Sequence, residues 1–423
     1  MHSDYFANNI STVNISQPGI TDLWEAAFSL GYPAALWRLP NQVDKHLIVS
    51  FDEVLPRVAA DLDELPAGFL ISPFDHIADR PDGDSPAQTL FLRANIQTVY
   101  HPNSQADIRE TQGETADRFW HTVATLAGRP TKPSMTLSGG RIQEDPNAQE
   151  QYIRNVTAAV QAMQQGLFRK VVLSRRKQVE FTDAPNAVAL FDKLCQAYPT
   201  AFISAVSIPE KGQIWISATP ERLVSTDANG IFQTASLAGT QSAFHPDGTA
   251  KRPPEAMWSQ KEIEEQAMVS RYIIECFKKI RLREYVEEGP KTLIAGNLMH
   301  LSTYFTVDTQ AVRYPQLGTV MLRLLHPTSA VCGTPRDKAF AFIQQHETHD
   351  RELYSGFLGP VNVNTASGSA TSIFVHIRCM KLEGSKATLY AGAGLTEDSV
   401  PEHEWQETEM KCQTLLNVMM NDE

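Results

Sequence analysis

The chain has 423 residues, of which 42% are hydrophobic and 20% are charged, a composition typical of a folded soluble protein with a large core. Its net charge of −12 at pH 7 opposes binding to nucleic acid and to acidic membrane surfaces. No stretch approaches the roughly 18 apolar residues of a membrane span, and the N-terminus lacks a basic region followed by an apolar run. We therefore expect a cytoplasmic protein with no nucleic-acid partner and no membrane partner.

The first third, up to about Gly128, mixes apolar segments such as HLIVS and GFLISPF with polar turns, and it contains no arrangement that indicates chemistry. From Gly128 to Asn147 the composition shifts to Pro, Gly, Ser and Thr, which indicates a linker or a long surface loop. The stretch AQEQYIRNVTAAVQAMQQGLF then places Tyr152, Val156 and Met163 at helical spacing. A helix is predicted here.

The next segment, FRKVVLSRR, alternates apolar and long polar residues, which predicts a strand that begins near Lys170. A lysine at the end of a strand is usually solvated, so the strand alone assigns no role to Lys170. The runs AFISAVSI, GQIWISATP, RLVST and IFQTASLAG follow between turn residues, and they predict an antiparallel meander.

The second half adds two long helices and two strands. WSQKEIEEQAMVSRYIIECFKKIR predicts a helix whose start carries the Ser-x-x-Glu capping box in Ser259 and Glu262. TSIFVHIRCMKLEG and ATLYAGAGL predict strands, and SVPEHEWQETEMKCQTLLNVM predicts a final helix with Pro401 in its first turn. The predicted fold class is α+β, with a large content of antiparallel sheet and with helices packed outside.

Five widely spaced cysteines contain no C-x-x-C pair, so we expect reduced thiols and neither a zinc site nor a disulfide framework. Carboxylates gather instead in two pairs with helical spacing: Glu262 with Glu265, and Glu404 with Glu407. Each pair points two like charges in one direction, which a hard cation such as Mg²⁺ would offset. Each pair is equally compatible with a solvated helix face.

Two cations and two glycine-containing runs are further candidates. Lys411 lies one turn after Glu407, and Arg378 interrupts the apolar strand FVHIRCMKL, where an unpaired charge would be costly. Both side chains could bind a carboxylate ligand, or they could form structural ion pairs. The runs YAGAGL and LAGT could allow a ligand to approach the backbone closely, or they could serve strand ends and bulges.

Taken together, these segments resemble the chorismate-utilising enzymes, and among them most closely the isochorismate synthases. The resemblance extends from about Gln151 to Met419. The segments that carry it occur in the family's order: FRKVVLSRR, SATPERL, SLAGT, SQKEIEEQAM, LMHL, LLHPTSAVCGTP, ETHDRELYSGFLG, FVHIRCMKL, YAGAGL and EWQETEMK. The resemblance implies one α+β unit of two antiparallel sheets packed face to face. Residues 1–128 would then be a scaffold portion of this fold, and residues 151–420 the chorismate-binding catalytic region.

Isochorismate synthases add water at C2 of chorismate while the C4 hydroxyl departs. The resemblance implies that Lys170 is the general base that activates the water and that Glu221 is the general acid that protonates the departing hydroxyl. These roles require a neutral lysine and a protonated glutamic acid. Relatives that use ammonia typically carry Gln where this chain has Lys170, and many carry Lys where it has Ala238. Water is therefore the expected nucleophile, no glutamine amidotransferase subunit is expected, and a monomer is expected.

The resemblance also implies the ligand contacts. Glu265 and Glu407 would hold Mg²⁺, with Glu262 and Glu404 as supporting acids. The chorismate contacts would come from the following residues: Gly239, Thr240, His300, Tyr354, Arg378, Gly392, Gly394 and Lys411. The chain departs from many relatives at Ile263, Glu264 and Gln406, which leaves the surroundings of the metal open.

Two alternative activities are compatible with the same motifs. A salicylate synthase makes isochorismate with the same lysine, acids and metal, and then eliminates pyruvate. A catalytically inactive relative would only bind chorismate, and its expected signature, loss of Lys170 or Glu221, is absent from this chain. Isochorismate itself feeds menaquinone, catechol siderophores and salicylate.

Overall fold

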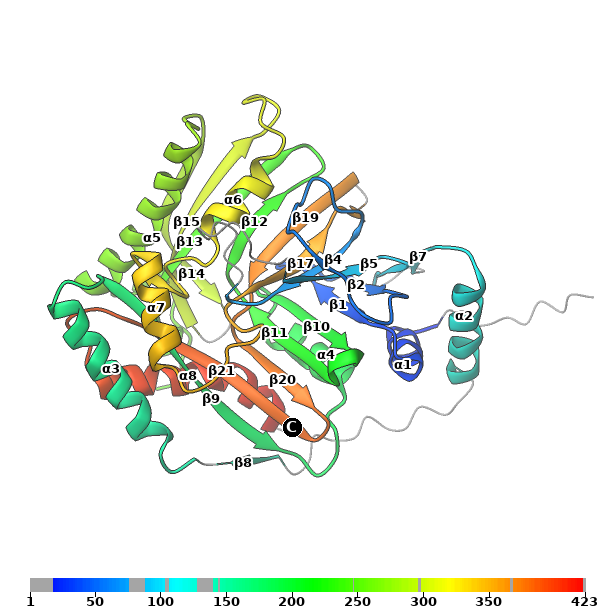
Figure 1. Ribbon diagram of the computed structural model, residues 1–423, viewed down its shortest axis with the longest axis horizontal. Coiled ribbons are helices and arrows are strands. Elements are labelled where there is room, and N and C mark those ends of the chain that lie inside the picture. Colours follow the sequence, from blue (N-terminus) through cyan, green and yellow to red (C-terminus); the bar gives the residue numbers. More distant parts are fainter. Residues whose placement is uncertain are drawn as a thin grey trace, which may run out of the picture.

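The structure is a computed structural model that describes residues 18–75, 88–102, 106–127, 140–143, 145–245, 247–295, 298–365 and 368–420. Two antiparallel sheets form its centre, and helices pack around them (Figure 1). This arrangement confirms the predicted α+β class. Of the predicted linker between Gly128 and Asn147, residues 128–139 and 144 lie outside the described residues.

The first sheet has eleven strands in the order β16-β9-β21-β20-β11-β10-β1-β2-β6-β7, with β8 also paired to β9. Their bounds are β1 (Ala34–Arg38), β2 (Lys45–Val49), β6 (Ile96–Tyr100), β7 (Asp107–Glu110), β8 (Arg141–Gln143), β9 (Lys170–Glu180), β10 (Phe202–Ile208), β11 (Gln213–Thr219), β16 (Gly333–Thr334), β20 (Cys379–Glu383) and β21 (Lys386–Leu395). The long β9–β21 pair, in register from Val171 opposite Leu395 to Glu180 opposite Lys386, therefore lies toward one end of this sheet.

The second sheet has ten strands in the order β14-β15-β13-β12-β19-β17-β4-β5-β3, with β18 also paired to β19. Their bounds are β3 (Arg57–Val58), β4 (Gly68–Ser72), β5 (Thr89–Arg93), β12 (Arg222–Thr226), β13 (Ile231–Ser242), β14 (Val286–Ala295), β15 (Leu298–Asp308), β17 (Phe357–Val361), β18 (Val363–Thr365) and β19 (Gly368–Val375). Strands from the first third enter both sheets, since β1 pairs with β10 and β4 pairs with β17.

The predicted meander over β10 to β13 is wrong at its centre. β10 pairs with β11 in the first sheet, and β12 pairs with β13 in the second sheet, but β11 and β12 do not pair with each other. The chain crosses from one sheet to the other at Pro220 and Glu221. Proline cannot donate a ladder hydrogen bond, so a strand is readily interrupted at this point. Glu221 consequently lies at the crossover between the sheets.

The sheets pack against each other through large apolar side chains. The rings of Phe202 on β10 and Phe374 on β19 stack with their centroids 4.1 Å apart, and Trp37 and Phe69 meet in the same layer. These side chains are almost completely buried. Alternation along each strand directs one set of side chains into this layer and the other set toward the helices.

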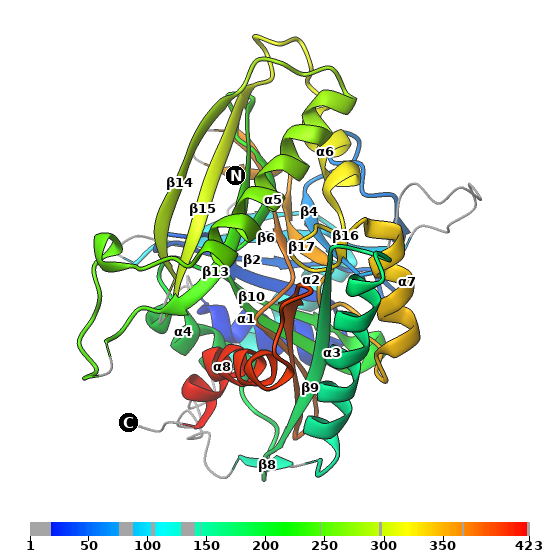
Figure 2. The ribbon, with the colours of Figure 1, turned by 90° about the vertical axis from the view of Figure 1, so that its left-hand side faces the viewer.

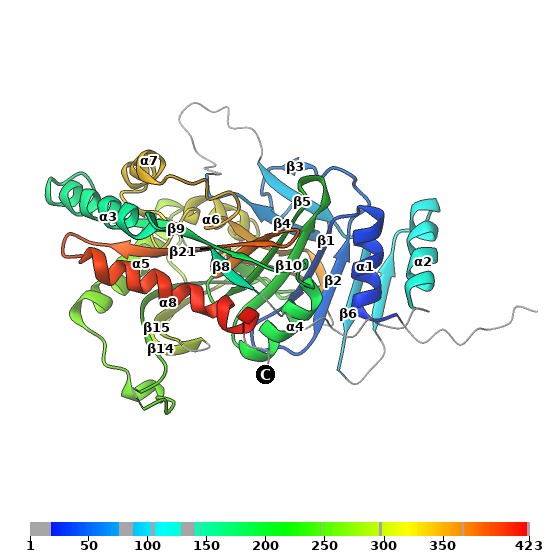
Figure 3. The ribbon, with the colours of Figure 1, turned by 90° about the horizontal axis from the view of Figure 1, so that it is seen from below.

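Helices cover the outer faces. Their bounds are α1 (Ile20–Leu30), α2 (Glu114–Ala127), α3 (Ala148–Gln164), α4 (Ala187–Ala197), α5 (Gln260–Lys279), α6 (Leu317–Leu325), α7 (Arg336–His346) and α8 (Pro401–Met420), with short 3-10 helices η1 (Pro209–Lys211) and η2 (Pro253–Glu255). Helices α1, α2, α4 and α8 pack on the first sheet, and α5 and α6 pack on the second (Figures 2 and 3). Helices α3 and α7 flank β9 and β21.

Local predictions for the helices are confirmed. α3 buries Tyr152, Val156 and Met163 along one stripe, as the helical spacing predicts. At the start of α5, the backbone N–H of Glu262 donates to Ser259 Oγ, and the backbone N–H of Ser259 donates to Glu262 Oε2 at 2.8 Å. All five cysteines are free thiols. Within the described ranges, no helix has the length and apolar character needed to cross a membrane.

Candidate active site

A cavity of about 380 Å³ lies between strands of both sheets and the helices α5 and α8. Eleven predicted site residues line it: Glu221, Gly239, Thr240, Glu262, Glu265, His300, Arg378, Gly392, Gly394, Glu407 and Lys411. The other three, Lys170, Tyr354 and Glu404, contact lining residues from behind, as described below. Segments distant in sequence therefore converge on one cavity.

Lys170 is the first residue of β9, and its side chain is only 1% exposed. Its Nζ donates a hydrogen bond to Glu265 Oε1 on α5 at 2.6 Å. Gly394 on the neighbouring β21 makes room for this pair, since a Cβ there would lie 3.0 Å from Glu265 Oε1 and 3.2 Å from Lys170 Cε. Burial favours the neutral form of Glu265, but the charge and hydrogen bond of Lys170 outweigh it and lower the pKa of Glu265.

Glu221 occupies the crossover between β11 and β12, where its backbone C=O accepts a hydrogen bond from the N–H of Val375 at 2.9 Å. Its carboxyl group lines the cavity, and it has no hydrogen bond or ion pair with any other described residue. Burial raises the pKa of Glu221 to about 7, and the charges of Lys170, Arg378 and Lys411 only partly oppose this shift. A protonated carboxyl group is thus available near neutral pH.

The LAGT segment forms an irregularity in β13, where the register with β15 shifts between Ala238 and Gln241 and Gly239 has φ +68°. The carbonyl oxygen of Gly239 lies 2.8 Å from His300 Nδ1 in a buried contact, and Nδ1 therefore carries the ring proton. His300 Nε2 is left as an unpaired acceptor within the described structure. Burial, followed by the charge of Arg378, lowers the pKa of His300 to about 3, so the ring is neutral.

The cationic wall comes from two elements. Arg378 has the positive φ of +48° between β19 and β20, and its Nη1 donates to Thr414 Oγ1 at 3.3 Å. Lys411 on α8 donates to the carbonyl oxygen of Gly392 at 2.9 Å. Tyr354 lies behind Gly392, since a Cβ at Gly392 would lie 2.9 Å from the Tyr354 hydroxyl. The small residues of YAGAGL therefore give the cavity its floor.

The remaining acids each have a partner from the protein. Glu407 Oε1 lies 2.6 Å from Lys411 Nζ, and Glu404 Oε1 lies 3.2 Å from Lys261 Nζ. Glu262 Oε2 accepts the hydroxyl of Ser259 at 2.8 Å, in addition to the capping N–H. In this arrangement the described residues contain no group of three or more His, Cys, Asp or Glu side chains close enough to hold a metal ion. The oxygen donors of the Glu residues are nevertheless the type that Mg²⁺ prefers.

Lys261 is the main lining residue that sequence reasoning misses. Its side chain links α5 to Glu404 on α8, and the two residues are 143 positions apart in the sequence, so no local spacing reveals the contact. The departures from many relatives, Ile263, Glu264 and Gln406, are exposed, and none of them lines the cavity. These three differences therefore leave the wall of the site unchanged.

The family model described as "Chorismate binding enzyme" matches residues 87–420. The chain belongs to this family. Isochorismate synthase EntC of Escherichia coli K12 is 30% identical over 251 residues, which cover 59% of this chain and 62% of EntC. Anthranilate synthase component 1 of Acetivibrio thermocellus is 27% identical over 339 residues, 78% of this chain and 64% of that protein. The matches thus span less than two thirds of either relative.

The fold agrees with a solved structure. MenF, the menaquinone-specific isochorismate synthase from Escherichia coli, superimposes with a TM-score of 0.71 at 21% sequence identity, over 95% of this chain and 91% of MenF. MenF thus shares the fold seen here, and the resemblance inferred from the ten sequence segments is confirmed at the level of family and fold.

Proposed function

We propose that this family member is an Mg²⁺-dependent isochorismate synthase, an isomerase that adds water at C2 of chorismate and releases the C4 hydroxyl. The observation that carries the proposal is that one cavity brings together the buried, unpaired carboxyl group of Glu221 and Glu265, which is hydrogen-bonded to the buried Lys170. Isochorismate synthases are also prominent among its relatives, EntC being one of them. A base and an acid with different surroundings suit a reaction that removes one proton and delivers another.

Glu221 is proposed as the general acid. Because burial raises its pKa to about 7 and no described residue pairs with its carboxyl group, it holds a proton at neutral pH that it can give to the departing hydroxyl. Lys170 is proposed as the general base for the attacking water. Nζ donates a hydrogen bond to Glu265, and it can take a proton from the water only as the neutral amine, because an ammonium group has no lone pair.

The substrate is a dianion, and two partly buried cations are placed to bind it. Arg378 and Lys411 line the cavity together with the backbone of Gly392 and Gly394, which lack Cβ atoms that would fill the floor. The unpaired Nε2 of His300 is an acceptor that can orient a hydroxyl of the substrate. We assign these groups to binding and orientation rather than to proton transfer.

Mg²⁺ would be held by Glu265 and Glu407, with Glu262 and Glu404 as supporting acids. When bound, the ion would neutralise these carboxylates and polarise a substrate carboxylate. Without the ion, Glu265 is paired with Lys170 and Glu407 is paired with Lys411. Each of these ion pairs would have to open for the carboxylate to bind Mg²⁺. Isothermal titration with MgCl2 should show an affinity lowered about 10- to 100-fold in Glu265→Ala and Glu407→Ala.

Glu264→Ala is the matched control for this titration, because Glu264 is an exposed acid on the same helix. Its magnesium affinity should equal that of the wild type. Equal affinities in all three variants would contradict the assignment of the metal ligands.

The activity itself is tested by product analysis. Purified protein, chorismate and Mg²⁺ are sampled over time by chromatography with mass detection, with EDTA in a parallel reaction. Isochorismate that approaches equilibrium with chorismate, and that is absent with EDTA, is the expected result. Stoichiometric salicylate and pyruvate would identify a salicylate synthase instead, and unchanged chorismate in every reaction would contradict catalysis.

A further inference from the structure

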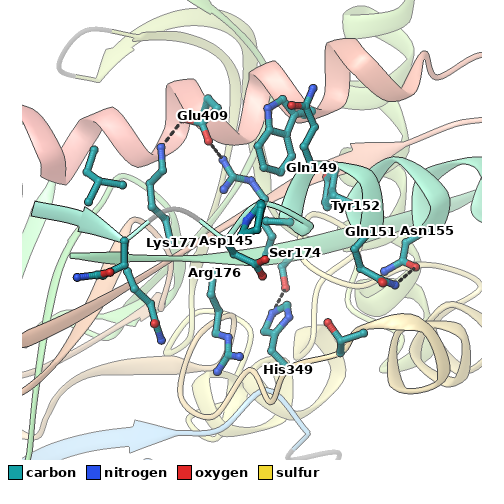
Figure 4. Close-up of a pocket in the computed structure, with 18 residues that line it drawn as sticks. Asp145, Gln149, Gln151, Tyr152, Asn155, Ser174, Arg176, Lys177, His349 and Glu409 are labelled. Atoms are coloured by element: carbon teal, nitrogen blue, oxygen red, sulfur yellow. Dashed lines mark hydrogen bonds and ion pairs between the residues drawn. The ribbon is translucent and has the colours of Figure 1, made fainter. Parts of the chain in front are cut away.

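A second and larger cavity, of about 540 Å³, lies along the middle of β9, from Ser174 to Gln178. It is lined by residues from α3, β8, β9, α8 and the segment that follows α7, many of which carry amides, hydroxyls or charges (Figure 4). Its size is that of a small-molecule site. Nothing in the proposed chorismate chemistry uses it, because the predicted catalytic, substrate-binding and metal-binding residues are absent from its lining.

Two of the three cations that line this cavity are already engaged. Arg175 forms an ion pair with Glu409 on α8 and stacks on the ring of Trp405 at 3.9 Å, and Lys177 Nζ lies 2.5 Å from Glu409 Oε2. These contacts lie on one side of the strand in Figure 4. Arg176, on the other side, is exposed, and its guanidinium has no hydrogen bond or ion pair to any described residue. Its guanidinium carries five donors suited to a bidentate contact with a carboxylate.

His349 supplies a complementary acceptor beside Arg176. Its side chain is only 6% exposed, and its Nε2 lies 3.0 Å from Ser174 Oγ (Figure 4). Ser174 Oγ also lies 3.0 Å from Glu347 Oε1, which can only accept, so the hydroxyl donates to Glu347 and Nε2 donates to Ser174. In the neutral ring, Nδ1 is then the acceptor, and it has no partner among the described residues. It can receive a hydroxyl proton from a ligand.

The floor of the second cavity is connected to the first cavity through a buried network. Glu347 accepts the backbone N–H of Ser174 at 2.6 Å and two guanidinium hydrogen bonds from Arg351 at 2.6 and 2.8 Å. Arg351 in turn donates to the carbonyl oxygens of Val172 at 2.8 Å and Val331 at 2.9 Å. Val172 lines the first cavity, as does the neighbour of Val331, Ala330. Hydrogen bonds thus connect Ser174 to the wall of the first cavity.

We propose that the second cavity is an effector site for a small hydroxycarboxylate, whose carboxylate binds Arg176 and whose hydroxyl donates to His349. Occupancy of this site pulls on Ser174 and changes the kinetics of chorismate turnover through Glu347 and Arg351. The net charge of −12 repels anions from the molecule as a whole. Binding of an anion in the second cavity therefore depends on the local positive charge of Arg176.

The test uses 3-fluoro-4-hydroxybenzoate as the probe, with binding followed by ¹⁹F NMR and turnover by chorismate consumption. Four proteins are compared: the wild type, Arg176→Gln, Arg378→Gln and Arg118→Gln. Arg378 lines the first cavity, so its variant reports probe bound there, and Arg118 is an exposed arginine on α2 that serves as the matched control. The neutral 3-fluoro-4-hydroxybenzamide is the control ligand.

The expected result is a probe affinity reduced about tenfold or more in Arg176→Gln alone, and a probe-induced change in the KM or kcat of the wild type that disappears in this variant. The benzamide should bind no better to the wild type than to Arg176→Gln. Binding that is unaffected by Arg176→Gln, or that is lost in Arg378→Gln, would overturn the site. Binding at Arg176 without any change in turnover would overturn the effector role.

Discussion

The two cavities beside β9 differ in how completely their buried carboxyl groups are paired. At the first cavity, Glu265 accepts a hydrogen bond from Lys170, and the carboxyl group of Glu221 has no partner among the described residues. At the second cavity, Glu409 accepts from both Arg175 and Lys177, and Glu347 accepts from the lining residue Ser174 and from Arg351. One strand therefore carries an incompletely paired site and a nearly saturated one.

The difference has a direct effect on the carboxyl groups. Burial raises the pKa of Glu221 to about 7 because the surrounding cations do not contact it. Burial also favours the neutral form of Glu409, but the hydrogen bond of Lys177 and the charge of Arg175 outweigh it and lower its pKa. The number of direct partners, rather than depth alone, decides whether a carboxyl group can act as an acid.

Removing the unpaired acid or the buried lysine should have the largest effect. Glu221→Gln keeps the shape of the side chain but cannot deliver a proton, and Lys170→Met removes the base. Each should lower kcat about 10²- to 10⁴-fold, measured as isochorismate formation, with an unchanged circular dichroism spectrum. Glu264→Gln, which alters an exposed acid, should retain wild-type kcat. Near-normal turnover in Glu221→Gln would contradict its role as the general acid, and near-normal turnover in Lys170→Met would contradict its role as the general base.

At the second cavity, where the carboxylates are paired, the largest effect should be on stability. Glu347 is 3% exposed, and Glu347→Ala leaves the buried guanidinium of Arg351 without its carboxylate. The free energy of unfolding, measured with urea, should fall by about 3–5 kcal/mol. Glu397→Ala, at an exposed acid, should change it by less than about 0.5 kcal/mol. A loss below about 1 kcal/mol for Glu347→Ala would contradict the stabilising role of the ion pair between Glu347 and Arg351.

Features that depend on neighbours in the sequence could be predicted. The capping contact of Ser259 with Glu262 and the buried stripe of α3 arise from spacings of three and four residues, which a sequence displays directly. The Lys170 strand was equally accessible, because alternation along nine residues defines its faces.

Features that depend on pairing between distant segments could not be predicted. The strands β11 and β12, on either side of Pro220, look in the sequence like neighbours in one meander. They belong to different sheets because β11 pairs with β20 and β12 pairs with β19, and both partners lie far along the chain. The contact of Lys261 with Glu404 joins two helices, and the second cavity combines side chains from five segments. Resemblance to a family predicts the residues of the first cavity, but no sequence motif predicts the second cavity.

The pH dependence of stability should have opposite signs for the two kinds of carboxyl group. With a folded pKa of about 7 and an ordinary value of 4.5, Glu221 binds more protons in the folded state, so its contribution to stability falls as pH rises through this window. Glu221→Gln should therefore gain roughly 2.5 kcal/mol relative to the wild type between pH 5 and pH 8. Urea unfolding at each pH gives this difference.

Glu409→Gln provides the contrast. Because the pKa of Glu409 is lowered, its contribution is present above the ordinary value and is lost as pH falls through the folded pKa. The cost of this substitution should therefore be constant from pH 5 to pH 8 and shrink only in more acidic solution. A pH-independent difference for Glu221→Gln would contradict the raised pKa.

The smallest effect should come from Lys177→Met. Lys177 and Lys170 lie on the same strand and each contacts a glutamate, but Lys177 is 16% exposed and Glu409 keeps Arg175 after the substitution. The free energy of unfolding should fall by less than about 1 kcal/mol, and kcat for chorismate should equal that of the wild type. A loss of activity comparable to that of Lys170→Met would mean that a lysine anywhere on β9 supports turnover through charge alone. Retained activity in Lys177→Met would instead show that turnover depends on the position of Lys170, which is buried beside Glu265.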